Sequence, residues 1–218
     1  MTPVVCIVGT SDSGKTTLIC RLIEELSKRG YRVATIKHHH AGFEMDHEGT
    51  DTFKHWGAGA RQVIISGPQK MALIRAVDPE PTLEDLAALY GGGYDLLLAE
   101  GFKNSTSPKI EIWRTGQPDE TLLCAGDPHC LALATDFPHD VEVPVLDLNW
   151  PDQVADFIET RFLKETRPMG VRLAVDGRPI PLNKFASRIL ESVVRGAVAS
   201  LRGCESPKHI VVEIESKT

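Results

Sequence analysis

The residues best suited to chemistry lie near the start of the chain, in a segment that matches the pattern G-x-x-x-x-G-K-[ST]. The segment reads Gly9-Thr10-Ser11-Asp12-Ser13-Gly14-Lys15-Thr16. In this pattern the glycines let the backbone curl, so that successive N–H groups point inward toward a phosphate. The lysine reaches the β- and γ-phosphates of a nucleotide, and the last hydroxyl binds Mg²⁺. The alternative is a chance match in an ordinary turn between a strand and a helix.

The neighbouring sequence supplies the structural context that this motif requires. Residues 4–8 form an apolar run rich in β-branched side chains, which predicts a strand buried on both faces. After the motif, Leu18, Ile19, Leu22, Ile23 and Leu26 recur as on one face of a helix, and Gly30 marks its end. We therefore predict that the segment binds a nucleotide, that Lys15 also acts in catalysis, and that Thr16 holds a magnesium ion. The predicted nucleotide-binding residues are Ser11, Asp12, Ser13, Gly14, Lys15, Thr16 and Thr17.

Another candidate for the nucleotide site is the acidic residue Glu100, which follows the apolar run 94–99. In a parallel sheet this carboxylate would emerge beside the phosphates, where it could bind Mg²⁺ through water or position the attacking water. We predict both a catalytic and a metal-binding role for Glu100. The alternative is an ordinary glutamate at the edge of a sheet.

Another carboxylate, Asp136, follows the predicted strand 131–134. A carboxylate there could accept the N1–H and N2–H groups of guanine, a pair that distinguishes guanine from other bases. The usual guanine-reading motif, N-K-x-D, is absent from the sequence. Asp136 is thus a candidate for reading the base, with a plain turn as the alternative.

The long polar loop of residues 37–52 carries four histidines and four acids. Adjacent histidines point in different directions on an extended chain, which disfavours a transition-metal site made by His38, His39 and His40. A loop that is solvated, or that touches phosphate, Mg²⁺ or an anionic substrate, is favoured. Asp46 or Asp51 could assist the magnesium ion, and Asp46 is our additional metal candidate. Cys124, His129 and Cys130 also carry ligand atoms, but one short loop supplies no second half of a metal site.

The totals indicate one α/β domain with a small appendage. The chain has 218 residues, 42% of them hydrophobic, and a formal net charge of −6, which argues against nucleic-acid and anionic-membrane surfaces. Five cysteines without a C-x-x-C pair suggest reduced thiols and a cytoplasmic protein. Met1-Thr2-Pro3 leads directly into the first strand, so we expect no signal peptide, and no apolar run is long enough to span a bilayer.

The remaining patterns predict further elements of a doubly wound sheet and a separate unit. Residues 1–163 form the predicted nucleotide-binding domain, 164–170 a linker, and 171–218 a small ββαβ unit of unknown role. The first domain also contains a predicted short helix at 52–58, a hairpin of strands 62–65 and 71–77, and a helix that begins after Thr82. Additional strands are predicted at 31–36, 109–113, 122–125 and 143–146, and a closing helix at 151–162. The small unit has a hairpin turn at Asp176-Gly177, a helix at 184–201 and a strand at 210–214.

Several of these segments together resemble the molybdopterin-guanine dinucleotide biosynthesis protein B family, MobB. The resemblance covers about residues 1–163 and is carried by the phosphate-binding segment, Ile36-Lys37-His38-His39-His40, Phe43-Glu44-Met45-Asp46, Gly49-Thr50-Asp51-Thr52, Gly57-Ala58-Gly59-Ala60, Leu98-Ala99-Glu100-Gly101-Phe102-Lys103 and Ala134-Thr135-Asp136. The region after Gly170 lies outside it.

This resemblance implies a P-loop NTPase fold with a mostly parallel sheet, usually in a homodimer. It implies GTP and Mg²⁺ at residues 11–17, with Glu100 and Asp46 near the metal. The implied function is that of a GTP-binding accessory protein, acting with a guanylyltransferase in molybdenum cofactor maturation; molybdopterin is a candidate ligand. Two alternatives remain, a nickel-delivery GTPase and a small-molecule kinase.

The resemblance also implies weak GTP hydrolysis, and one argument from the residues agrees. No arginine stands in or next to the phosphate-binding segment in the sequence. GTPases that lack an arginine finger are slower by about 10³–10⁵-fold. We therefore expect slow turnover by the isolated protein.

Overall fold

The computed structural model describes residues 2–116, 121–164, 171, 173–175, 178–180, 182, 184–204 and 210–212. The chain divides into two compact units, Met1–Lys164 and Glu165–Thr218. Most of the predicted linker, residues 165–170, lies outside the described residues. In the described part of the chain, no helix is both long and apolar enough to cross a membrane.

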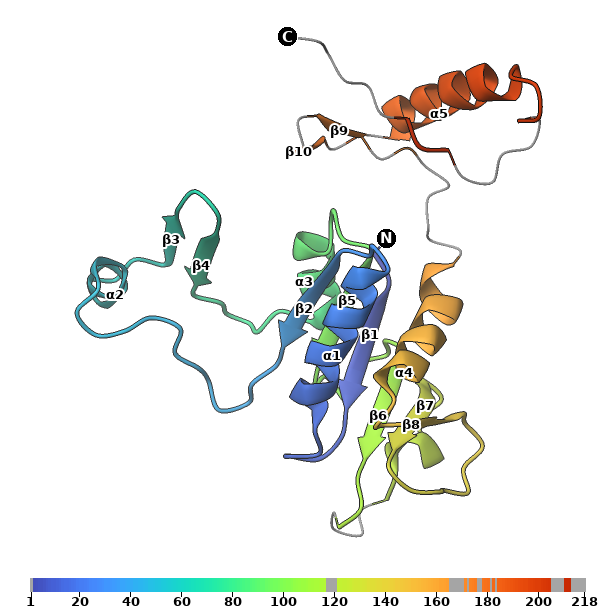
Figure 1. The fold of residues 1–218 in the computed structure, drawn as a ribbon. Helices are drawn as coiled ribbons and strands as arrows, with labels where there is room; N and C mark the ends of the chain where they lie inside the picture. The colour runs from blue at the N-terminus through green and yellow to red at the C-terminus, as the bar shows by residue number, and fades with distance from the viewer. Residues whose placement is uncertain are drawn as a thin grey trace. The chain divides into compact units, whose positions relative to one another are not determined.

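The first unit is built on a six-stranded sheet in the order β2-β5-β1-β6-β7-β8 (Figure 1). Its strands are β1 (Val4–Val8), β2 (Val33–Lys37), β5 (Leu96–Glu100), β6 (Lys109–Trp113), β7 (Cys130–Thr135) and β8 (Val145–Asp147). All neighbouring pairs in this sheet are parallel. The central strands are buried almost throughout, as near-continuous apolar runs predict for a sheet covered on both faces. The predicted parallel α/β fold is therefore confirmed.

Two helices cover one face of this sheet. They are α1 (Lys15–Lys28) and α4 (Pro151–Ile158), the latter continuing as a π-helical turn, η2 (Glu159–Leu163). Leu18, Leu22 and Leu26 of α1 are buried against alternate strand residues such as Ile7 and Ile112. The leucines of α1 recur with the period of a helix and the strand residues alternate with a period of two, so both sets face the same core.

The opposite face has a smaller apolar cluster. Leu83, at the start of α3 (Leu83–Tyr90), packs there with Cys6 and Val8 of β1, and Leu123 joins from the edge. Thr82 caps α3 as predicted, in a capping box with Asp85. This face also receives the side chains of β6 that alternate with Ile110 and Ile112.

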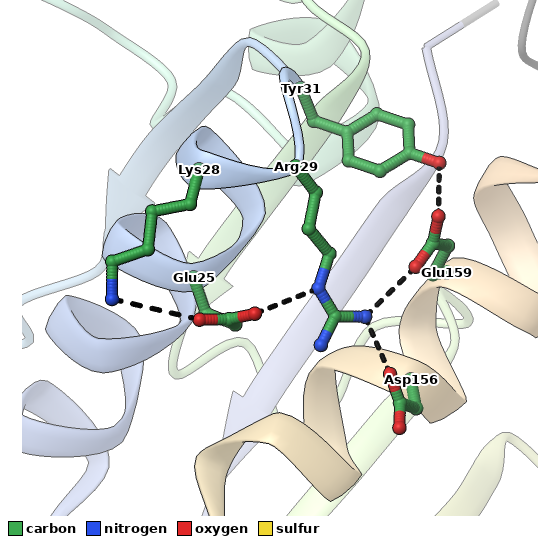
Figure 2. A network of polar contacts seen from close by, with 6 residues as sticks. All are labelled: Glu25, Lys28, Arg29, Tyr31, Asp156 and Glu159. Atoms are coloured by element: carbon green, nitrogen blue, oxygen red, sulfur yellow. Dashed lines mark hydrogen bonds and ion pairs between the residues drawn. The ribbon is translucent and has the colours of Figure 1, made fainter.

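A charged network fastens α1 to α4 (Figure 2). The Arg29 guanidinium donates to Glu25 at 2.9 Å, to Asp156 at 2.5 Å and to Glu159 at 2.8 Å, and the Tyr31 hydroxyl donates to Glu159 at 2.7 Å. Because these residues come from the end of the first helix and from the last helix of the unit, the network joins distant parts of the sequence.

A short helix and a two-stranded hairpin lie between β2 and α3 in the chain. Helix α2 (Asp51–Gly57) begins after Thr50, whose hydroxyl accepts a hydrogen bond from the N–H of Phe53. The predicted hairpin is confirmed as an antiparallel pair, β3 (Gln62–Ser66) and β4 (Met71–Arg75).

Two predicted elements of the first unit differ from the structure. Residues 122–125 were expected to form a strand, but Leu123–Ala125 form a 3₁₀ turn, η1. The buried carboxylate of Glu111 accepts the N–H groups of Leu123 and Cys124, and so stabilises the turn. The predicted helix 151–162 is α-helical only to Ile158, after which its hydrogen bonds widen to the π pattern.

The second unit contains an antiparallel hairpin, β9 (Leu173–Val175) with β10 (Arg178–Ile180), and a helix, α5 (Lys184–Ala199). The predicted turn residues Asp176-Gly177 lie outside the described residues. The prediction of a strand at 210–214 is wrong for its described part, because residues 210–212 are not in a strand.

Candidate functional site

The segment between β1 and α1 adopts a tightly curled backbone. Gly9 has a φ of +146°, and a Cβ at this position would lie 2.6 Å from the carbonyl oxygen of Ile112. Gly14 has a φ of +96° and caps α1 in a left-handed conformation. Only glycine fits both the conformation and the space at position 9, so the first glycine of the motif has a structural reason.

Lys15 folds back over this curled segment. Its ammonium group donates to the carbonyl oxygens of Gly9 at 3.1 Å and of Thr10 at 2.5 Å. Removal from water lowers the pKa of Lys15, although the Glu100 carboxylate opposes this shift. The ammonium is therefore held above the loop, at the place where the motif requires a cation.

Two hydroxyl groups of the loop lack hydrogen bonds among the described residues. Thr10 Oγ1 and Ser13 Oγ are buried without a partner, and Ser13 is wholly buried. Buried polar groups normally find a partner, so these hydroxyls suit a ligand that supplies acceptor oxygens, such as a phosphate. Ser11, Asp12, Thr16 and Thr17 are exposed on the same segment.

Glu100 lies beside this loop because β5 is a direct neighbour of β1. Ile7 pairs with Glu100 in the register of the two strands. The hydroxyl of Thr16 lies 3.1 Å from each carboxylate oxygen of Glu100. The structure thus brings together Thr16 and Glu100, two of the three residues predicted to hold a metal.

Lys37 completes this polar group and was not anticipated. It pairs with Glu100 in the register of β2 and β5, and its ammonium lies 3.0 Å from Glu100 Oε1. The sequence shows only that Lys37 stands at the end of a predicted strand. Its contact with Glu100 depends on the pairing of β2 with β5, which the sequence pattern does not specify.

An arginine distant in the sequence lies next to the phosphate-binding segment in space, so the absence of a neighbouring arginine in the sequence does not mean that the loop lacks one. The guanidinium of Arg114 comes within 3.3 Å of the position that a Cβ on Gly14 would occupy. Arg114 follows β6, which pairs with β1 on the side away from β5. Parallel neighbours end at the same edge of a sheet, and this brings distant residues to the loop.

Asp136 follows β7 at this edge and is held by Thr115. Its Oδ1 accepts the backbone N–H of Thr115 at 2.9 Å and the hydroxyl of Thr115 at 3.0 Å. The backbone hydrogen bond is the main cause of a lowered pKa for Asp136, so its carboxylate is charged at neutral pH. These contacts fix the carboxylate next to Thr115, which directly follows Arg114 in the chain. Its role in reading guanine stays a prediction.

The hydrogen bonds that the structure shows for Asp46 are local. Oδ1 accepts from the N–H of His47 at 2.9 Å and from the hydroxyl of Thr50 at 2.7 Å. Oδ2 is buried and has no hydrogen-bond partner among the described residues. The structure therefore does not join Asp46 to Thr16 or Glu100, and its metal role also stays a prediction.

The start of the histidine loop lies beside the end of β5. His38 Nε2 lies 2.8 Å from Glu80 Oε1, and the His38 ring contacts the rings of His40 and Phe102. The backbone N–H of His38 donates to the carbonyl of Glu100 at 3.1 Å. His38 thus has acidic and aromatic neighbours, and the described loop histidines do not form a group of three metal ligands.

Comparison with known proteins agrees with this arrangement. The family model "Molybdopterin guanine dinucleotide synthesis protein B" (MobB) matches residues 4–136. The chain belongs to the MobB family. A curated relative, the molybdopterin-guanine dinucleotide biosynthesis adapter protein of Haemophilus influenzae, is 39% identical over 158 residues, which are 72% of this chain and 88% of the relative. The protein of the same name from Escherichia coli is 36% identical, over 72% and 92% of the two chains.

MobB structures share the fold of the first unit. A crystal structure of molybdopterin-guanine biosynthesis protein B superposes with a TM-score of 0.58 at 32% identity, over 72% of this chain and 97% of that one. The crystal structure of Bacillus subtilis MobB gives 0.59 at 27% identity, over 73% and 98%. A relative from Methanocaldococcus jannaschii, described as a putative molybdopterin-guanine dinucleotide biosynthesis adapter protein, is 27% identical over 97% of both chains, so its similarity extends into the second unit.

Proposed function

We propose that this chain binds GTP with Mg²⁺ and acts as an adapter in the biosynthesis of molybdopterin guanine dinucleotide. The nucleotide proposal is supported mainly by the hydrogen bond between Thr16 and Glu100. This pair lies beside the loop whose carbonyl groups hold the Lys15 ammonium. The adapter role is supported by the relatives from Haemophilus influenzae and Escherichia coli, which are molybdopterin-guanine dinucleotide biosynthesis adapter proteins.

The residues present fit a nucleoside triphosphate and its metal. The loop N–H groups, the N-terminus of α1 and Lys15 would hold the phosphates, and the buried hydroxyls of Thr10 and Ser13 would gain acceptors. Thr16 and Glu100 would hold Mg²⁺, with Glu100 acting directly or through a water. When bound, the ion neutralises charge on the phosphate oxygens.

Transfer of Lys15 from its carbonyl partners to the phosphates would accompany binding. In the structure the Lys15 ammonium interacts only with two neutral carbonyl groups among its described hydrogen bonds. A phosphate is a stronger partner than a carbonyl, because the attraction between opposite charges adds to the hydrogen bond. Lys15 would thus exchange a resting position for a charged contact.

Arg114 changes the argument about hydrolysis. With its guanidinium beside Gly14, the absence of a nearby arginine no longer supports slow turnover. Slow hydrolysis is now an expectation from the family resemblance alone. Arg114 is instead proposed to bind a phosphate oxygen, for which its planar fork of donors is suited.

The proposed preference for GTP depends on Asp136 and is tested by comparing nucleotides. Titration calorimetry with GTP and ATP, each with Mg²⁺, is expected to favour GTP in the parent chain. Asp136→Asn should reduce that preference, because an amide offers only one acceptor oxygen to the two N–H groups of guanine. The same preference in the variant and the parent would reject the role of Asp136.

The adapter proposal concerns partners and needs a separate experiment. A guanylyltransferase of the same pathway and a second copy of this chain are the proposed protein partners, and molybdopterin is a candidate small ligand. Exposed apolar residues on the β3–β4 hairpin, Ile64, Ile65 and Met71, support self-association. Light scattering gives the oligomeric state, and co-purification tests binding of the guanylyltransferase. A monomer that does not co-purify with the guanylyltransferase would contradict the proposal.

A further inference from the structure

A second group of reactive side chains comes from β6, from η1 and from the start of β7. Glu111, Cys124 and Cys130 each offer a ligand atom, and these atoms all lie within 4.8 Å of one another. Within the described residues this is the only group of three such ligands. Glu111 is 5% exposed and Cys130 is 3% exposed, so this group differs from the exposed clusters of acidic residues that are common on protein surfaces.

The first reason for this cluster is the position of Glu111 in β6. Ile110 and Ile112 point into the core beneath α1, so Glu111 points to the opposite face. There its Oε1 accepts the N–H of Leu123 at 2.9 Å, and its Oε2 accepts the N–H of Cys124 at 3.0 Å. The Cys124 thiol also lies 3.0 Å from Oε2. The strand thus supplies the second half of a site that the loop alone lacks.

The second reason is an ion pair that fixes the other end of the same loop. Lys109 is completely buried two residues before Glu111, and its ammonium lies 2.9 Å from Asp127 Oδ2. The carbonyl of Asp127 in turn accepts the N–H of Cys130 at 2.9 Å. Because β6 holds the loop at both points, Cys124 and Cys130 come together against Glu111.

We propose that Glu111, Cys124 and Cys130 bind Zn²⁺. Two cysteine sulfurs and a carboxylate form a ligand set that suits zinc, whereas Mg²⁺ and Ca²⁺ require oxygen ligands alone. Tetrahedral zinc with Zn–S bonds of about 2.3 Å places ligand atoms roughly 3.5–3.8 Å apart. The three ligand atoms already lie within 4.8 Å of one another, and binding would move Cys124 Sγ away from its 3.0 Å hydrogen-bond distance to Glu111 Oε2 toward this spacing. Zn²⁺ replaces the two thiol protons, which pass to the buffer, and water takes the fourth position.

The site would stabilise a strand that supports the phosphate-binding loop. Glu111 pairs with Val8 in the parallel register, and Val8 directly precedes Gly9. The carbonyl of the next residue, Ile112, closes off the space beside Gly9. A zinc ion on Glu111 therefore fixes η1 to the strand on which the first glycine rests.

Cobalt provides a spectroscopic test, because Co²⁺ replaces Zn²⁺ and reports its ligands. The full chain is reduced, freed of metal and titrated anaerobically with Co²⁺. The expected result is one ion per chain with thiolate-to-cobalt charge-transfer absorption, lost when one equivalent of Zn²⁺ is added. Absence of stoichiometric binding, or binding without the thiolate bands, would overturn the proposal. The second result would show that the cysteine sulfurs are not ligands of the metal.

Variants identify the sulfurs that are responsible. Cys124→Ser and Cys130→Ser are each expected to lose the charge-transfer bands. The matched control is the double variant Cys20→Ser/Cys204→Ser, which removes two cysteines outside the cluster and is expected to bind as the parent does. Retained bands in both cluster variants, or bands lost in the control, would contradict the assignment.

Two measurements on the unaltered chain do not depend on how well the variants fold. Zn²⁺ is expected to raise the thermal unfolding temperature relative to a sample with chelator, since it binds the folded state. It is also expected to protect Cys124, but not exposed Cys20, from alkylation mapped by mass spectrometry. Equal alkylation of Cys124 with and without Zn²⁺, or a disulfide between Cys124 and Cys130 in protein purified without reductant, would overturn the proposal.

Discussion

The hydroxyl of Thr16 lies 3.1 Å from both carboxylate oxygens of Glu100, although 84 positions separate the two residues. The contact joins the first turn of α1 to the end of β5, and its two members are the proposed magnesium ligands. The Lys37 ammonium, 3.0 Å from Glu100, balances the carboxylate charge. In the proposed complex Mg²⁺ would take over this role.

Glu100→Gln is expected to slow Mg²⁺-dependent GTP hydrolysis by about 10²-fold or more, because the amide can neither hold the ion nor orient water as a carboxylate does. The amide oxygen can still accept the Thr16 hydroxyl, so the local fold should persist. Single-turnover hydrolysis over a range of Mg²⁺ concentrations measures the effect. Glu24→Gln, on the exposed side of α1, is the matched control. An unchanged rate in Glu100→Gln would remove Glu100 from the site.

Arg114→Ala is expected to weaken GTP binding by about 10- to 150-fold, since a hydrogen bond to a charged group contributes roughly 1.5–3 kcal/mol. Arg114→Lys should restore part of the affinity, because it keeps the charge but loses the planar fork. Calorimetric titration compares both with Arg21→Ala, an exposed arginine of α1. If Arg114→Ala and Arg21→Ala bind GTP equally well, Arg114 does not contact the nucleotide.

The network of Figure 2 predicts unequal effects on stability from neighbouring charges. Arg29→Ala removes bonds to three carboxylates and is expected to lower the free energy of unfolding by about 1–3 kcal/mol. Tyr31→Phe should cost about 1 kcal/mol. Lys28→Ala, whose side chain is 73% exposed, should change stability by less than about 0.5 kcal/mol. Urea unfolding measures all three, and a larger loss in Lys28→Ala than in Arg29→Ala would contradict the network.

The ion pair between buried Lys109 and half-buried Asp127 predicts acid sensitivity. Burial raises the pKa of Asp127, but the hydrogen bond from Lys109 and the backbone N–H of His129 outweigh it, so the pKa lies below the ordinary 3.8. A lowered folded-state pKa gives stability that is fully present above the unfolded value of 3.8 and is lost as the pH falls through the folded pKa.

Asp127→Asn removes this contribution and leaves Lys109 without a carboxylate. Its expected cost near neutral pH is about 1–3 kcal/mol, below the range for a fully buried pair, because the Asp127 side chain is 17% exposed and the amide oxygen can still accept from Lys109. Its unfolding free energy should also fall less steeply than that of the parent chain below pH 4. Chemical unfolding at a series of pH values measures both effects. Parallel pH profiles for the two proteins would show that the pair does not control acid stability.

Much of the fold followed from local patterns in the sequence. The apolar runs at β1 and β5 predicted buried strands, the spacing of Leu18, Leu22 and Leu26 predicted α1, and Thr82 predicted the start of α3. These features depend on residues close together in the chain. The prediction of a strand at 122–125 failed because a distant group, the Glu111 carboxylate, stabilises a turn there.

The candidate site was predictable only where a motif or a strand end marked it. The glycines, Lys15, Thr16 and Glu100 stood in recognisable patterns. Lys37 and Arg114 reach the site through the strand order β2-β5-β1-β6, which periodicity does not specify. The grouping of Glu111 with two cysteines likewise depends on a pairing between a strand and a loop that no local signal indicates.

Calorimetric titration of the folded chain measures whether the loop between β1 and α1 holds GTP with magnesium. The parent protein should bind one GTP per chain in the presence of Mg²⁺, and Lys15→Ala should retain its circular dichroism spectrum but lose measurable binding. A folded parent chain that binds no GTP, or a Lys15→Ala variant that binds it with unchanged affinity, would contradict the account.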